Sequence, residues 1–243
     1  MRIKIILSYD GSRFDGFQVQ KHTKNTVSQK ITTALKSLNI TSCFTASGRT
    51  DKNVHALNQV LHLDLPPYWS NLSKLKKYLN NSLLPHIFIK KIDNVNKDFH
   101  ARYGAKSRIY RYIVSTKKPS VFLTPYVTYI KKIDEKLIKD AISEFKGIHN
   151  FEYFKKNGSD TKNFTRTIYK TNFYKYKDFY IFYFEANGYL RSQIRMMVSF
   201  LLKISDGKLS KNELKLQLNL EDNFSSSLAP PNGLYLSKIK YGA

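Results

Sequence analysis

The sequence predicts an α+β protein made of two halves, each with the element order β-α-β-β-α-β. Three observations lead to this prediction. Short segments carry hydrophobic residues at every second position, which is typical of strands, and longer segments carry them three or four positions apart, as in helices. The same order of segments then occurs twice along the 243 residues. We therefore expect two domains, residues 1–104 and residues 105–243.

The elements of the first half follow from alternation and from helix-capping residues. Thr26 and Gln29 have the spacing of a capping box at the start of a helix. Ser70 is the expected N-cap of the second helix, which should close at Asn80. The expected elements are a strand at 3–9, a helix at 27–38, strands around residue 44 and at 57–63, a helix at 72–79 and a strand at 86–92.

The second half repeats this order. Asp134 should cap its first helix, Gly147 should end that helix, and the turn residues 230–233 precede the last strand. The expected elements are a strand at 107–115, a helix between 134 and 147, strands at 167–176 and 179–186, a helix at 190–204 and a strand at 234–241. The order is that of ferredoxin-like and RRM-like domains. Two such halves could join their antiparallel sheets around a central cleft.

The composition indicates a polyanionic partner. The chain has 41 Lys and Arg against 18 Asp and Glu, a net charge of +23, together with 17 Tyr and 16 Phe. Positive charge interleaved with aromatic rings suits nucleic acid, whose bases can stack. An AT-rich genome would also enrich lysine, but that bias adds acidic residues and Asn as well.

Cysteine usage and hydropathy indicate a reduced, cytoplasmic protein. The single cysteine, Cys43, excludes an internal disulfide and any multi-cysteine metal site, and we expect it to be a small core residue. The apolar run near the start is too short for a signal peptide, and no stretch approaches the ~18 apolar residues of a membrane span.

A short polar loop between two predicted strands is the best candidate for chemistry. Residues 46–60 read ASGRTDKNVHALNQV, with Asp51 two residues after Arg49. Loops carry reactive groups while strands hold their ends in place. The alternative is an ordinary turn, in which Asp51 bonds to its own backbone and Arg49 is solvated.

Five segments of the chain resemble, in order, those of the tRNA pseudouridine synthase A (TruA) family, which acts on the anticodon stem and loop of tRNA. The match runs nearly from end to end. The segments are YDGSRFDGFQVQ at 9–20, SGRTDKNVHALNQV at 47–60, DFHARYGAKSRIYRYIV at 98–114, NGYLRSQIRMMVSF at 187–200 and LAPPNGLYLSKIKY at 228–241.

This resemblance implies that Asp51 is the catalytic nucleophile and that the halves are RRM-like, the first carrying the aspartate loop. Conversion of uridine to pseudouridine neither adds nor removes an atom, so we expect no cofactor and no metal. A carboxylate can bond to C6 of the base or to C1′ of the sugar and leave again. The residue types leave open which carbon it attacks.

The resemblance also assigns five substrate-binding residues. Arg49 would take the place of the flipped-out base, and Arg195 would pair with the catalytic aspartate. Tyr110 would pack against the target uracil, with Leu234 on the far side of the pocket. Arg102 is the expected phosphate contact.

Other residues of the motifs carry no catalytic assignment. His55 and His100 have no second His or acid at metal or triad spacing, and we expect structural or RNA-contacting roles. Lys52 and Asn53 stand where the family usually has Ala-Gly. Asn tolerates a left-handed backbone almost as well as glycine does, so the loop can keep its shape.

The expected function is therefore a tRNA pseudouridine synthase, an isomerase acting at positions 38–40. The family implies a homodimer that grips tRNA, with no membrane association. Two alternatives stay open: a non-catalytic RNA-binding protein on paired RRM-like sheets, for which Asp51 would be incidental, and a related synthase that acts on another RNA.

Overall fold

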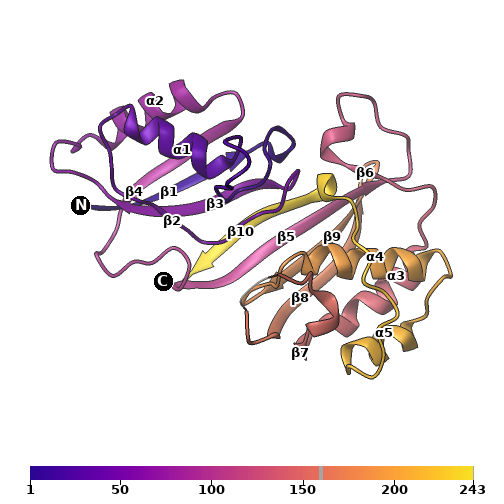
Figure 1. Cartoon of the computed structure of the whole chain (residues 1–243). Coiled ribbons are helices and arrows are strands. Elements are labelled where there is room, and N and C mark those ends of the chain that lie inside the picture. Colours follow the sequence, from indigo (N-terminus) through magenta and orange to yellow (C-terminus); the bar gives the residue numbers. More distant parts are fainter. Residues whose placement is uncertain (159–160, 243) are drawn as a thin grey trace. The chain divides into compact units, whose positions relative to one another are not determined.

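The computed structural model describes residues 1–158 and 161–242 (Figure 1). The chain groups into two compact units: residues 1–106 together with 235–242, and residues 107–234. Each unit combines helices with mostly antiparallel strands, so the predicted α+β class is confirmed. The last strand groups with the first unit, whereas the sequence places it in a domain at 105–243.

The sheet of the first unit has the order β4-β1-β3-β10, and the short strand β2 pairs with β3. Strands β1 and β3 are antiparallel, with Ile5 opposite Leu61. Strands β3 and β10 are parallel, with Ala56 opposite Leu236. The strands are β1 (Arg2–Tyr9), β2 (Thr45–Ala46), β3 (His55–Asp64), β4 (Ile87–Asn94) and β10 (Leu234–Tyr241).

Two helices, α1 (Val27–Lys36) and α2 (Leu72–Leu83), lie on one face of this sheet (Figure 1). Thr26 caps α1 as predicted, because its side chain accepts a hydrogen bond from the Gln29 N–H at 3.2 Å. The second helix is capped by Asn71 rather than Ser70. It also continues past Asn80, whose side-chain amide bonds both backbone groups of Ile89 on β4, at 2.7 and 3.1 Å. This asparagine therefore joins the helix to the sheet and does not end it.

The sheet of the second unit has the order β5-β9-β8-β7, and β6 pairs with β5. Its core is aromatic: the ring centroids of Phe145 and Phe184 lie 6.4 Å apart, and those of Phe154 and Phe200 lie 5.9 Å apart. Many of the aromatic residues counted in the composition therefore stabilise the fold. The strands are β5 (Ala105–Ser115), β6 (Thr128–Tyr129), β7 (Gly147–Asn150), β8 (Thr165–Tyr176) and β9 (Phe179–Ala186).

The helices of the second unit are α3 (Glu135–Ile142), α4 (Gln193–Ser205) and α5 (Lys211–Leu218). The sequence analysis missed α5, although Ser210 and Glu213 form a complete capping box at its start. Helix α4 begins three residues later than predicted. The reason is Ser192, whose φ of 58° is left-handed and interrupts the helix.

Two expectations from the sequence, on Cys43 and on membrane spans, can be compared with the structure. Cys43 is exposed and precedes the two-residue strand β2, so its prediction as a core residue was wrong. No helix in the described part of the chain has both the length and the apolarity that crossing a membrane requires.

Candidate active site

The loop that carries Asp51 connects β2 to β3 in the first unit. It begins where the Ser47 N–H donates to the Val60 carbonyl at 2.9 Å, and it turns where the Val54 N–H donates to the Asp51 carbonyl at 3.2 Å. Asn53 within the turn has a φ of 63°, the left-handed conformation for which Asn is suited. The Asp51 side chain is half-buried and Arg49 is exposed.

Gln59 on β3 holds the approach to this loop. Its side chain is fully buried; Oε1 accepts from the Ser47 hydroxyl at 2.7 Å, and Nε2 donates to the Gly48 carbonyl at 3.0 Å. The sequence analysis treated Gln59 only as one position of an alternating strand. The strand also contains buried His55 and His62, so a polar residue in it did not single out Gln59 as a support of the loop.

Replacement of Gln59 by leucine should destabilise the first unit. Leu has a similar volume but leaves the Ser47 hydroxyl and the Gly48 carbonyl without their buried partner. We expect a loss of about 1–3 kcal/mol in the free energy of unfolding, measured by urea denaturation. Equal stability of Gln59→Leu and wild type would contradict this role.

Thr50, the residue before Asp51, is also anchored. The hydroxyls of Thr50 and Tyr9 are 2.7 Å apart, and the Phe17 N–H donates to the Thr50 carbonyl at 3.0 Å. Phe17 therefore fixes the loop from a second segment. The loop is held by β1, by β3 and by residue 17, which leaves its half-buried carboxylate on a fixed support.

His55 follows this loop and has a structural role. It is 2% exposed, its Nδ1 accepts the Gly11 N–H at 3.0 Å, and its ring stacks on Tyr235 with centroids 4.7 Å apart. These contacts join the end of β1, the start of β3 and β10.

Arg102, the expected phosphate contact, lies in an exposed turn of the first unit. Its guanidinium lies 5.6 Å from the centre of the Tyr103 ring, and that ring stacks on His100 with centroids 4.5 Å apart. His100 in turn accepts the N–H groups of Arg102 and Tyr103 at its Nδ1, at 3.2 and 3.1 Å. Tyr103 is 78% exposed, so the turn presents a ring and a cation to solvent.

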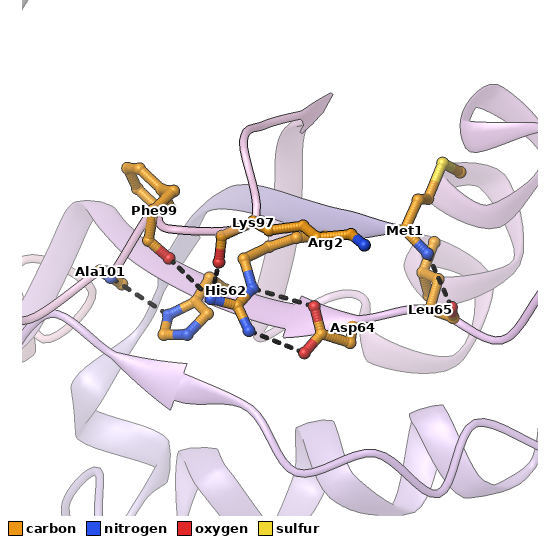
Figure 2. A network of polar contacts seen from close by, with 8 residues as sticks. All are labelled: Met1, Arg2, His62, Asp64, Leu65, Lys97, Phe99 and Ala101. Atoms are coloured by element: carbon orange, nitrogen blue, oxygen red, sulfur yellow. Dashed lines mark hydrogen bonds and ion pairs between the residues drawn. The ribbon is translucent and has the colours of Figure 1, made fainter.

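The segment before this turn is tied to the sheet by the network in Figure 2. Arg2 forms a bidentate ion pair with Asp64, at 2.9 and 2.8 Å, and its Nη1 also donates to the carbonyls of Lys97 and Phe99. His62 accepts the Ala101 N–H at Nδ1, at 3.1 Å (Figure 2). This hydrogen bond requires His62 Nδ1 to be unprotonated.

The His62 contact predicts a pH dependence of stability. Burial lowers the pKa of His62 below its ordinary value of 6.5, and nearby His100 and Arg2 lower it further. The unfolded chain therefore binds this proton more readily than the folded protein, so the contribution is complete above about pH 6.5 and is lost as the pH falls through the lower folded pKa. The free energy of unfolding should decrease on acidification.

This dependence can be measured by urea denaturation between pH 7.5 and 5. In His62→Asn the amide oxygen can accept the Ala101 N–H but does not titrate, so the decrease should become shallower. An identical slope for variant and wild type would show that other groups cause it.

In the second unit, Tyr110 lies on β5 and is 9% exposed. Its ring meets Tyr189 edge to face, with centroids 5.2 Å apart. Burial raises the pKa of the Tyr189 hydroxyl well above its ordinary value. Tyr112, two positions along the strand, is fully buried and donates to the Pro230 carbonyl at 2.7 Å, as expected of a core tyrosine.

Arg195 lies on α4, and its Nε donates to the Ala229 carbonyl at 2.7 Å. The Ala229 N–H returns a bond to the Arg195 carbonyl at 3.0 Å, which holds the chain that leads to the buried Leu234. Arg191 precedes α4 and does not share a helix with Arg195. It donates instead to the Asn157 and Gly158 carbonyls, at 3.0 and 3.1 Å.

The candidate residues thus fall into two sets. The first unit holds Arg49 and Asp51 in one loop, with Arg102 in a separate turn. The second unit holds Tyr110 on β5, Arg195 on α4 and Leu234 at the start of β10. The pairing of Arg195 with Asp51 joins the two sets and stays a prediction. Among the described residues, no three His, Cys, Asp or Glu side chains group to form a possible metal site.

Comparison with known proteins identifies the family. The chain matches the family described as tRNA pseudouridine synthase over residues 5–104 and 141–242. It is 44% identical to a tRNA pseudouridine synthase A of Campylobacter jejuni, over 99% of this chain and 100% of that protein. It is 40% identical to those of Wolinella succinogenes, over 97% and 92% of the two chains, and of Helicobacter hepaticus, over 98% of each. The chain belongs to the tRNA pseudouridine synthase A family, whose members are isomerases.

Proposed function

We propose that this protein converts uridine to pseudouridine at positions 38–40 in the anticodon stem-loop of tRNA, with Asp51 as the nucleophile. One observation carries the assignment of Asp51: its half-buried carboxylate projects from a loop whose two sides are hydrogen-bonded to β1, β3 and Phe17. An aspartate in an ordinary solvated turn has no need of so many anchors.

The reaction needs no external reactant. The bond from N1 of the base to C1′ of the ribose breaks, and a bond from C5 to C1′ forms. The hydrogen on C5 leaves as a proton, and N1 takes up a proton. Addition of the Asp51 carboxylate to C1′ or to C6 is compatible with this balance, and the carboxylate is released at the end. A cofactor would have no atom or electron to supply.

The other candidate residues act on the substrate. The target uridine must leave its stack, at a cost of a few kcal/mol, and exposed Arg49 fills the gap. The Tyr110 ring packs against the uracil with Leu234 opposite, and a base stacked on an aromatic ring recovers ~1–3 kcal/mol. Arg195 pairs with the Asp51 carboxylate, and Arg102 binds a phosphate of the RNA.

The wider arrangement follows the family. The strand order β4-β1-β3, with β2 beside β3, supports an RRM-like first half carrying the aspartate loop. The second half, which carries Tyr110, Arg195 and Leu234, is proposed to be RRM-like as well. We propose that the protein acts in the cytoplasm as a homodimer on tRNA.

The decisive experiment incubates wild-type protein with an unmodified tRNA transcript, without cofactor, and maps pseudouridine by position. Pseudouridine confined to positions 38–40 is the expected result. Binding without any pseudouridine would favour the RNA-binding alternative or a synthase for another RNA, and pseudouridine elsewhere in the transcript would overturn the assigned positions.

A further inference from the structure

An ordered loop in the second unit presents apolar side chains to solvent. It follows β5 and covers residues 116–127. At its tip the carbonyl of Ser120 accepts the N–H groups of Leu123 and Thr124, both at 3.0 Å, and the Thr124 hydroxyl at 2.9 Å. Val121 and Phe122 on this tip are 79% and 85% exposed. Figure 1 shows the loop extending beyond the end of β5.

The base of the loop is held in place as well. The side-chain amide of Asn232 donates to the carbonyls of Thr124 and Val127, at 2.8 and 2.9 Å. The Asn232 contacts and the hydrogen bonds to Ser120 hold the backbone around Phe122, whose side chain is 85% exposed. Val121 and Phe122 are adjacent, and contiguous exposed apolar side chains rimmed by polar residues mark interaction sites.

A second exposed segment lies beside this loop. The end of β8 and the turn that follows it read Lys175-Tyr176-Lys177-Asp178. Lys117 at the start of the loop forms an ion pair with Asp178 at 2.7 Å. Tyr176 is 59% exposed, with the Lys177 ammonium 5.8 Å from its ring centre. We call residues 117–123 and 175–178 together the basic-aromatic tip.

The charge of the basic-aromatic tip favours a polyanion. It contains four lysines, Lys117, Lys118, Lys175 and Lys177, and one acid, Asp178. The acid is already paired with Lys117, which lowers the pKa of its carboxyl, and Lys175 lowers this pKa further. Lysines pair with the phosphates of unpaired nucleotides, and exposed aromatic rings stack on their bases.

We propose that the basic-aromatic tip binds unpaired nucleotides of the substrate RNA other than the reacting uridine, with a base stacked on Phe122. The loop leaves β5 five residues after Tyr110, about 17 Å along an extended strand, so it contacts a different nucleotide. The proposal rests on the proposed function only for the identity of the RNA.

A second copy of this chain fits the surface less well. Lysine is depleted at the centres of protein interfaces. In a symmetric contact the same patch meets itself, so four lysines would face four lysines with one acid from each copy between them. An RNA partner places negatively charged phosphates against the four lysines, so the repulsion between lysines of two copies does not arise.

The test is binding of an unmodified tRNA transcript, by filter binding at several salt concentrations, to wild type and four variants. Phe122→Ala should weaken binding by about 5- to 150-fold, the effect of one lost base stack, while Phe122→Trp should retain affinity. Lys118→Ala should reduce the log-log salt slope by about 0.7–0.9. Ile148→Ala, which removes an apolar side chain that is 71% exposed outside the tip, is the matched control and should bind as wild type does.

The outcomes separate this inference from the proposed function. Unchanged affinity of Phe122→Ala overturns the inference even if the protein forms pseudouridine, and a change in its sedimentation coefficient at unchanged RNA affinity would indicate a second copy as the partner. Tip-dependent binding without pseudouridine formation overturns the proposed function and supports the inference. A wild-type protein that does not bind the transcript overturns both.

Discussion

Asp51→Asn is expected to abolish pseudouridine formation while tRNA affinity stays within about threefold of wild type. Asn has nearly the shape of Asp but cannot act as the carboxylate nucleophile, and removal of a nucleophile lowers the rate by a factor on the order of 10⁴ or more. The change leaves in place the hydrogen bonds of the Asp51 backbone, Ser47 and Thr50 that hold the loop, so the loop should persist. The measurement is single-turnover pseudouridine formation together with binding of the same transcript.

Two further variants sharpen this test. Asp51→Glu keeps the carboxylate but displaces it by one methylene, and a shift of about 1 Å can cost on the order of 100-fold. Asp15→Asn changes an aspartate outside the loop, one that pairs with Lys52 of the loop at 2.8 Å, and should keep activity within about tenfold. A wild-type rate of pseudouridine formation by Asp51→Asn would show that Asp51 is an ordinary turn residue and not the nucleophile.

Gly11→Ala is expected to lower the free energy of unfolding by at least about 3 kcal/mol, at the upper end of overpacking effects, and to reduce activity. Gly11 follows β1 and packs against the chain leaving the Asp51 loop. A Cβ added there would lie 2.0 Å from the Val54 carbonyl oxygen and 2.4 Å from its carbon. Because the Val54 N–H bonds the Asp51 carbonyl, the displacement reaches the proposed nucleophile.

The matched control is Gly48→Ala in the same loop. A Cβ at Gly48 would meet nothing within 4 Å, so the free energy of unfolding should stay at the wild-type value. The measurements are urea denaturation and single-turnover activity of both variants. A Gly11→Ala protein as stable as wild type would show that the two segments separate easily and that their packing does not position Asp51.

Local patterns in the sequence predicted most elements of the fold. Alternation located β5, β9 and β10, and Thr26 and Asp134 were recognised as N-caps because capping depends on a few adjacent residues. The errors arose where packing overrides local preference. Asn is a residue type that often ends a helix, yet Asn80 lies within one, and its side chain bonds the backbone of Ile89.

The candidate site was likewise predicted in part. Asp51 and Arg49 were predicted from a motif of adjacent residues, and the tolerance of Asn for a left-handed backbone anticipated the φ of 63° at Asn53. Gln59 and Gly11 were not predicted as supports of the loop. Their importance depends on which backbone groups lie against them, and spacing along the chain does not contain this information.

The sequence by itself determined the α+β class, the family and the loop that carries Asp51, because period, caps and motifs act over short distances along the chain. Only the tertiary structure decided that β10 pairs in parallel with β3, with Tyr235 opposite His55. It also decided that Phe122 stays exposed on an ordered tip while other phenylalanines form the core. Strand partners and side-chain burial depend on contacts between residues far apart in sequence, and these contacts form only when the chain packs.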